Sequence, residues 1–267
     1  MNLLILNRSI RTIIVGLGLI LFQSCAPVSV RPPIPPFDQQ QIAHLISSLR
    51  EQDTRVQTFF SSGRLSLEAK DSDSEANVLI VGTKDPLRMK VEITHPWGRP
   101  LLHALIRDGT VNILSFPEKR YYFGHLGGAD GPAFFPVSLE PDQLWGLVRG
   151  YPVVEDHDRA VSLKGNQIIL LSKSAEQVQV IDLYPQSILP RLILFPGKDM
   201  RVLFEDFEND NGILYAQRVR FNRPGTNTTL SLNTKQMTFN KAIPESIFEL
   251  YIPPDFEVRS LHNAGDR

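Results

Sequence analysis

The residues best suited to acid–base, nucleophilic or metal chemistry are scattered along this sequence. The histidines show no close metal-ligand spacing, and no His-Glu-x-x-His motif is present. The Gly-x-Ser-x-Gly turn that exposes a nucleophilic serine in many hydrolases is also missing. We therefore expect a binding protein rather than an enzyme, and a hydrolase with an unrecognised site is the catalytic alternative. The histidines are His44, His95, His103, His125, His157 and His262.

Two short stretches have some features of ligand loops. Gly124-His125-Leu126-Gly127-Gly128 is glycine-rich but lacks the Lys-Ser/Thr pair of a phosphate loop, so an ordinary loop over residues 124–136 is expected. Residues 206–212 are acidic, but their ligand spacing is wrong for calcium, and a hairpin turn explains them better. We expect no cofactor and no metal.

Trp97 lies in a stretch whose neighbours favour a sharp turn. Gly98 and two prolines flank it, which is typical of turns. The apolar/polar alternation over residues 87–94 predicts a half-buried strand before the turn, and the apolar run 101–106 predicts another after it. Trp97 would either cap one end of the core or project as an exposed prong that touches lipid or an apolar cargo.

The first 24 residues predict a secretory signal. Arg8 and Arg11 precede an apolar, uncharged run over residues 12–22, which is too short to span a membrane comfortably. Cys25 is the only cysteine, so an internal disulfide is excluded, and it stands where a signal would be cleaved.

Residues 21–25, Leu-Phe-Gln-Ser-Cys, resemble the lipobox of bacterial lipoproteins, in which the cysteine is acylated and becomes the first mature residue. Phe22 and Gln23 depart from the usual pattern, and an ordinary signal with a chance cysteine is the alternative. Several acyl chains on Cys25 would anchor the protein stably in a membrane, whereas a single acyl chain gives only marginal membrane binding. Because Ala26 rather than aspartate follows, the resemblance implies the periplasmic face of the cell outer membrane.

The mature chain starts with a proline-rich stretch, residues 25–37, which predicts an extended tether. Residues 38–267 are expected to form a single domain. The whole chain carries 28 basic and 29 acidic residues, a balance that disfavours a nucleic-acid binder.

Residues 38–60 have the period of an amphipathic helix. Asp38 is a suitable N-cap, and Leu45 and Leu49 belong to the apolar stripe. Glu51 precedes Arg55 by four positions and can pair with it on the solvent face. The Ser-Ser-Gly at 61–63 is expected to end this helix.

A second helix is predicted over residues 139–150. Its apolar face would comprise Leu144, Trp145, Leu147 and Val148, and Gly150 would end it.

The remaining apolar residues recur with the period of two that is typical of strands, and Asp108-Gly109 is a strong hairpin signal between two of them. No long helices separate the strands, which disfavours a parallel doubly wound sheet. We predict an α+β, mainly β fold, in which two helices cover part of the concave apolar face of one open antiparallel sheet and leave a groove. The clearest strands are 64–69, 77–83, 87–94, 101–106, 120–123, 160–163, 167–171, 177–183, 191–195, 201–207, 213–221 and 228–239.

The order of tether, helix, hairpins and turn resembles the LolB family of outer-membrane lipoproteins. Three stretches carry the resemblance: the helix that runs into Ser62-Gly63-Arg64-Leu65, the turn at residues 94–101, and the mid-chain helix that leads to Gly150-Tyr151-Pro152. The C-terminal Ile252-Pro253-Pro254 looks more like LolB-like relatives of uncertain function.

The resemblance implies an open half-barrel whose apolar groove takes acyl chains and whose protruding turn assists delivery into the membrane. Trp97 stands where that family has an exposed leucine. The implied membrane or cargo prong is Trp97, Leu101 and Leu102, and the implied groove or lid residues are Leu144, Trp145, Leu147, Val148, Leu45 and Leu49.

The resemblance also implies partners. These are the acyl chains of lipoproteins, a LolA-like periplasmic carrier and outer-membrane lipid, with the protein acting as a monomer. The alternative from a different class is a structural or assembly lipoprotein that binds a protein partner in envelope biogenesis through its sheet edge or an apolar patch.

Overall fold

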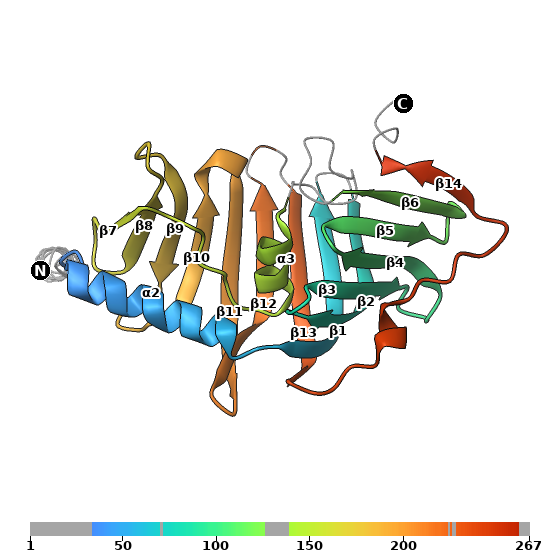
Figure 1. The fold of residues 1–267 in the computed structure, drawn as a ribbon, viewed down its shortest axis with the longest axis horizontal. Helices are drawn as coiled ribbons and strands as arrows, with labels where there is room; N and C mark the ends of the chain where they lie inside the picture. Colours follow the sequence, from blue (N-terminus) through green and yellow to red (C-terminus); the bar gives the residue numbers. More distant parts are fainter. Residues whose placement is uncertain (1–33, 70–71, 126–138, 224, 226–227, 262–267) are drawn as a thin grey trace, which may run out of the picture. The chain divides into compact units, whose positions relative to one another are not determined.

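The described part of the chain is built around one open sheet of 14 strands (Figure 1). The computed structural model describes residues 34–69, 72–125, 139–223, 225 and 228–261, and the elements belong to the unit Pro35–Arg267. The strand order is β14-β6-β5-β4-β3-β2-β1-β13-β12-β11-β10-β9-β8-β7. Neighbouring strands are antiparallel except β14, which runs parallel to β6. The predicted open, mainly antiparallel α+β fold is confirmed.

The strands match the segments that the period of two predicts, and several strands extend beyond the predicted residues at one or both ends. The strands are β1 (Thr58–Ala69), β2 (Ser72–Thr83), β3 (Arg88–Thr94), β4 (Pro100–Arg107), β5 (Thr110–Ser115), β6 (Arg120–His125), β7 (Arg159–Val161), β8 (Gln167–Leu171), β9 (Gln177–Leu183), β10 (Pro190–Phe195), β11 (Met200–Asp210), β12 (Ile213–Arg223), β13 (Thr228–Phe239) and β14 (Glu257–Ser260). The helices are α2 (Gln39–Thr54) and α3 (Pro141–Val148), with short 3-10 turns η1 (Pro196–Lys198) and η3 (Glu245–Phe248).

Helix α2 begins where the sequence predicts and ends earlier. The Asp38 side chain accepts a hydrogen bond from the Gln41 amide, and the Gln41 side chain accepts one from the Asp38 amide, which is a capping box. The predicted Glu51–Arg55 ion pair is present, at 2.6 Å. The predicted helix end at residue 60 is wrong, because β1 has already begun at Thr58.

The reason is that the aromatic end of the predicted helix fits a strand equally well. Phe59 is buried in the core, whereas Phe60 is on the other face and partly exposed, as alternation requires. Ser61 to Gly63 lie inside β1, where a bulge falls between Ser62 and Gly63. A Cβ at Gly63 would come within 2.2 Å of the Asn233 carbonyl oxygen, so this bulge needs glycine.

Both helices pack on the same face of the sheet (Figure 1). The Phe37 amide donates to Ser162 Oγ just after β7, which holds the start of α2 at that edge. At the other end of α2, Gln52 donates to the Gly212 carbonyl and accepts from the Leu214 amide. Helix α2 therefore crosses the sheet from β7 to the β11–β12 turn, and its buried stripe forms one core with the inner face of the strands.

The C-terminal segment covers the opposite face of the sheet and one of its edges. Phe248 packs on Val81 and Leu105, which alternate with inward-facing core residues of β2 and β4. Beyond it, β14 pairs with β6, and Arg120 and Glu257 form an ion pair at 3.2 Å. An edge strand is thereby covered, which limits pairing with other chains.

Candidate functional site

The concave face of the sheet holds an apolar cavity of about 460 Å³ between α3 and the strands. This volume is within the range of about 300–1,000 Å³ that is typical of small-molecule sites. Only three of the lining residues are polar, and none is a histidine, cysteine, lysine or arginine. The lining comprises Leu65, Leu67, Ser74, Glu75, Ala76, Val78, Ile80, Val91, Ile93, Leu101, Leu102, Ala104, Ile113, Leu139, Leu144, Leu147, Val148, Val219, Phe221, Thr228, Leu230 and Leu232.

Strand register explains why the floor of the cavity is apolar. Directly paired residues lie on the same face of a sheet, so inward rows form across several strands. One row runs from Val219 through Leu232 and Leu65 to Ala76. Another row crosses β2, β3, β4 and β5 at Ile80, Val91, Ala104 and Ile113.

Helix α3 forms the opposite wall. Leu144, Leu147 and Val148 line the cavity, as does Leu139 just before the helix. Pro141 occupies the first turn, where a missing amide hydrogen does no harm, and the Gln143 side chain accepts from the Glu140 backbone. The predicted helix is thus present in a shorter form, and residues 149 and 150 lie beyond its last turn.

Three residues proposed for the groove or lid do not line the cavity. Trp145 is fully buried on the other side of α3, edge to face with Phe59 at a centroid distance of 5.0 Å. Leu45 and Leu49 are buried under α2 in the main core. These side chains fix the positions of the helices rather than offering surface to a ligand.

The C-terminal end of α3 is fixed by a tight backbone contact. Gly150 has a φ of +77°, and its carbonyl accepts from the Ala216 amide at 2.7 Å. The Tyr151 amide donates back to the Gly146 carbonyl at 3.0 Å, which closes the last turn. A Cβ on Gly150 would come within 2.6 Å of the Ala216 carbonyl oxygen, so only glycine fits.

A buried charged cluster ties α3 to α2 and to the β2–β3 turn. Arg149 is fully buried and donates to Asp53 at 3.2 Å, while Lys84 pairs with the other oxygen of Asp53. Burial lowers the pKa of the Arg149 guanidinium to about 10, an effect partly offset by Asp53 and Tyr151. Burial also raises the pKa of the Tyr151 hydroxyl, to about 12. Arg149 is therefore charged at neutral pH.

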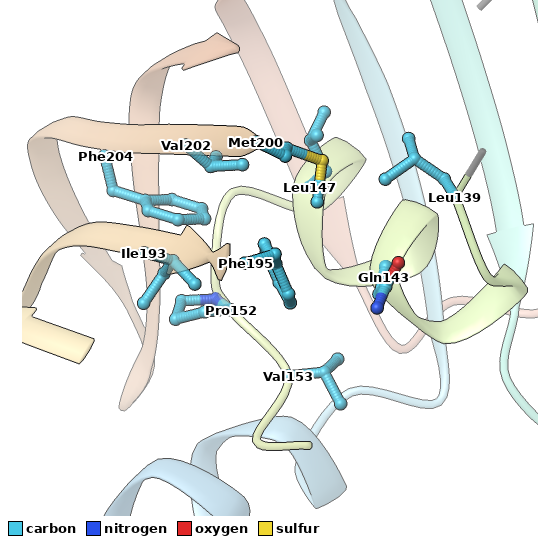
Figure 2. Close-up of a pocket in the computed structure, with 10 residues that line it drawn as sticks. All are labelled: Leu139, Gln143, Leu147, Pro152, Val153, Ile193, Phe195, Met200, Val202 and Phe204. Carbon is cyan, nitrogen blue, oxygen red and sulfur yellow. The ribbon is translucent and has the colours of Figure 1, made fainter. Parts of the chain in front are cut away.

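A second, much smaller hollow of about 20 Å³ lies between α3 and the strands β10 and β11 (Figure 2). Leu139 and Leu147 line both this hollow and the large cavity. The other lining residues are Gln143, Pro152, Val153, Ile193, Phe195, Met200, Val202 and Phe204.

Trp97 is 87% exposed at the tip of the β3–β4 turn. Its ring stacks on His95 at a centroid distance of 4.2 Å. The turn is closed by a bond from the His95 amide to the Arg99 carbonyl, and Gly98 has a φ of +87°. The core-capping interpretation is excluded, and the indole is presented to solvent.

The strand ends beside this turn contribute directly to the cavity. Ile93, Leu101 and Leu102 line it, and Ile93 pairs with Leu102 across the hairpin. The predicted prong residues therefore divide between two places, because Trp97 is exposed while the two leucines are half-buried in the lining.

The remaining candidates add no second site. Residues 206–210 end β11, and Asn211-Gly212 form the turn to β12, as the hairpin interpretation predicts. Within the described residues, no group of three or more His, Cys, Asp or Glu could hold a metal ion. No described helix is long and apolar enough to cross a membrane. Cys25 and residues 126–136 of the glycine-rich stretch are outside the described residues.

Comparison with known proteins identifies the fold. No family model matches the chain, and no curated protein matches it. Among solved structures, a LolA superfamily protein from Nitrosomonas europaea matches with a TM-score of 0.52 at 14% identity, covering 77% of this chain and 97% of that chain. The chain has a LolA-like fold. A DUF1329 family protein from Desulfovibrio piger matches with a TM-score of 0.56, also at 14% identity, covering 77% of this chain and 95% of that chain.

The LolA-like fold agrees with the fold that the sequence resemblance implies, whereas membership of the LolB family stays a prediction. The sequence missed the part of the site contributed by the C-terminal half of the chain. Val219, Phe221, Leu230 and Leu232 were recognised only as strand residues. The period-two alternation of these residues was enough to predict their strands. Their position opposite α3, however, depends on the pairing of β13 with β1.

Proposed function

We propose that the protein is an outer-membrane lipoprotein, anchored through Cys25, that binds acyl chains in its large cavity. In this role it helps to receive lipoproteins, or other lipidated cargo, and to insert them into the outer membrane. The observation that carries the proposal is the cavity of about 460 Å³ with its almost wholly aliphatic lining.

The chemistry of the lining favours a flexible hydrocarbon ligand. Each methylene moved from water into such surroundings gains about 0.8 kcal/mol. The lining offers no cation to bind a phosphate and no paired catalytic groups. Its polar members, Ser74, Glu75 and Thr228, come from the ends of β2 and β13 that lie near each other across β1. An acyl chain would lie inside, with its polar head at this rim.

The exposed indole supports the delivery step. Trp97 is joined through a short turn to strands that line the cavity, so contact of the indole with a membrane brings the cavity close to the lipid surface. A LolA-like periplasmic carrier is the proposed donor. That donor is inferred from the resemblance of the sequence to LolB.

The test is lipid binding by variants that fill the cavity. Ala76 lines it, and Ala76→Trp should occupy much of its volume and abolish binding of a fluorescent fatty acid and of palmitate. Ala43→Trp, at an exposed position of α2, is the matched control and should bind as the unaltered protein does. Native mass spectrometry after gentle purification should also show bound lipid in the unaltered protein.

Equal fatty-acid binding by both variants would contradict the proposal. A protein partner in place of lipid in the native mass spectrum would instead favour an assembly lipoprotein.

A further inference from the structure

The small hollow beyond α3 shares two of its lining residues with the large cavity. Leu139 and Leu147 contribute to the lining of both. In Figure 2 Leu147 and Met200 come from α3 and β11 and both border the small hollow. The two spaces therefore lie next to each other along α3.

The floor under the two hollows is continuous. Phe221 and Val219 line the large cavity from β12, and Val202 and Phe204 line the small hollow from β11. Val202 pairs directly with Phe221, and Phe204 pairs directly with Val219. Neighbouring strands lie about 4.8 Å apart, so the floor of the small hollow begins one strand beyond that of the cavity.

The small hollow offers a ligand no free polar partner among its lining side chains. Gln143 is the one polar member, and its Oε1 accepts from the Glu140 amide and from Lys198 Nζ. Its Nε2 donates to Glu155 at 2.9 Å. A ligand group placed here would have to be apolar, as the methyl end of an aliphatic chain is.

The hollow is also narrow, and its walls can yield. A volume of about 20 Å³ is close to that of one water-sized probe. Met200 is unbranched and adapts readily to a neighbour, and Leu147 is only half-buried. A single extended chain could enter after these side chains move.

We propose that the small hollow is the chain-end subsite of the acyl-binding site. The methyl end of a long saturated chain passes beneath Leu147 into the space beside Met200, and these two side chains set the longest chain that is bound tightly. This inference rests on the proposed function, because it assumes that the large cavity takes the rest of the chain.

The experiment measures affinity of the purified chain for saturated fatty acids from decanoate to eicosanoate, by competition with a fluorescent fatty acid. Leu147→Ala and Met200→Ala enlarge the hollow and should favour stearate and eicosanoate over decanoate by a factor of about four for each further methylene buried. Val202→Phe fills the hollow and should weaken binding of the longest acids while leaving decanoate unchanged.

Leu49→Ala is the matched control, because it removes the same atoms as Leu147→Ala from the core under α2, outside both linings. Denaturant unfolding of each variant confirms that it is folded. Unchanged length dependence in all three hollow variants, with fatty acids still bound, overturns the subsite alone. Failure of the unaltered protein to bind any chain overturns both the subsite and the proposed function.

Discussion

At the scale of single residues, Trp97 shows how a local turn can prevent a large apolar side chain from reaching the core. The turn at Gly98 is too tight for the chain to fold back over the sheet. The indole of Trp97 stacks on the ring of His95. Most tryptophans bury most of their surface. An indole that is 87% exposed therefore leaves nearly all of its apolar surface available for contact with lipid or an apolar cargo.

We expect Trp97→Glu to weaken association with vesicles of outer-membrane-like phospholipid and to slow transfer of lipidated cargo to them. Moving about 200 Å² of indole surface out of water contributes roughly 4–5 kcal/mol, and a carboxylate would reverse that preference. Vesicle flotation and a reconstituted transfer assay measure the two effects. The unfolding free energy should change little, because the side chain makes no core contact.

Leu163→Glu provides the control for Trp97→Glu. Leu163 is 71% exposed between β7 and β8, at the edge of the sheet that is farther from β3 and β4. Its replacement should leave vesicle binding and transfer unaltered. Equal loss in both variants would indicate a general effect of added negative charge and would remove Trp97 from the delivery step.

Arg149 is the residue that sequence patterns could not single out. Its partners are Asp53 from α2 and Tyr151 from the segment after α3, and Asp53 also pairs with Lys84 from the β2–β3 turn. Nothing in the local pattern around any of them signals burial of a charge. Two of its nitrogens, Nε and Nη1, have no partner within the described residues, so Asp53 provides most of the compensation for a costly desolvation.

At the scale of elements, the position of α3 decides whether the concave face is a cavity or a closed core. The helix has only two turns, so its own hydrogen bonds hold it weakly, and tertiary contacts must place it. Trp145 packs against Phe59 on one side, and Gly150 pairs with Ala216 at the end. These contacts keep Leu144 and Leu147 at a fixed height above the sheet.

We expect Gly150→Ala to destabilise the protein strongly. A positive φ costs an alanine about 1–2 kcal/mol, and the clash of its Cβ with the Ala216 carbonyl adds a further ~1–3 kcal/mol. Gly98→Ala is the matched control, because Gly98 also has a positive φ but has open space around the Cβ position. Urea unfolding compares the two. Similar losses would show that the contact with Ala216 does not fix α3.

Sequence periodicity located nearly all of these elements, and its errors have physical causes. Phe59 and Phe60 were assigned to a helix because a short apolar run fits both periods, and pairing with β2 and β13 decides in favour of a strand. Strand β14 was missed because Glu-Val-Arg-Ser has a single apolar residue. It is held by its pairing with β6, by the Arg120–Glu257 ion pair and by Leu261, which packs against Gly124.

At the scale of the whole molecule, the sequence predicted a partly covered concave face but not its extent. The sequence predicts only two amphipathic helices for a sheet of many strands. Two helices are too few to cover the whole face of such a sheet. Which residues would be left to line the cavity follows from the pairing of β1 with β13, a contact between residues more than 150 positions apart. No local pattern specifies a contact of that range.

A ligand that occupies this cavity should stabilise the entire fold, because its walls come from both halves of the chain. Leu65 and Val78 belong to the first half, Val219 and Leu232 to the second, and α3 lies between them in sequence. Binding to the native state alone contributes about 2.7 kcal/mol when the free ligand is a hundredfold above its Kd. For a domain of this size the melting temperature should rise by roughly 5–10 °C.

Differential scanning fluorimetry with palmitate measures this rise, and Ala76→Trp should lose it, since the indole would occupy the ligand's place. A melting temperature unchanged by palmitate in the unaltered protein, at concentrations where binding is saturated, would mean that the acid binds the unfolded chain as tightly as the native fold. In that case binding would not require the folded cavity, and the cavity could not be the place from which cargo is delivered.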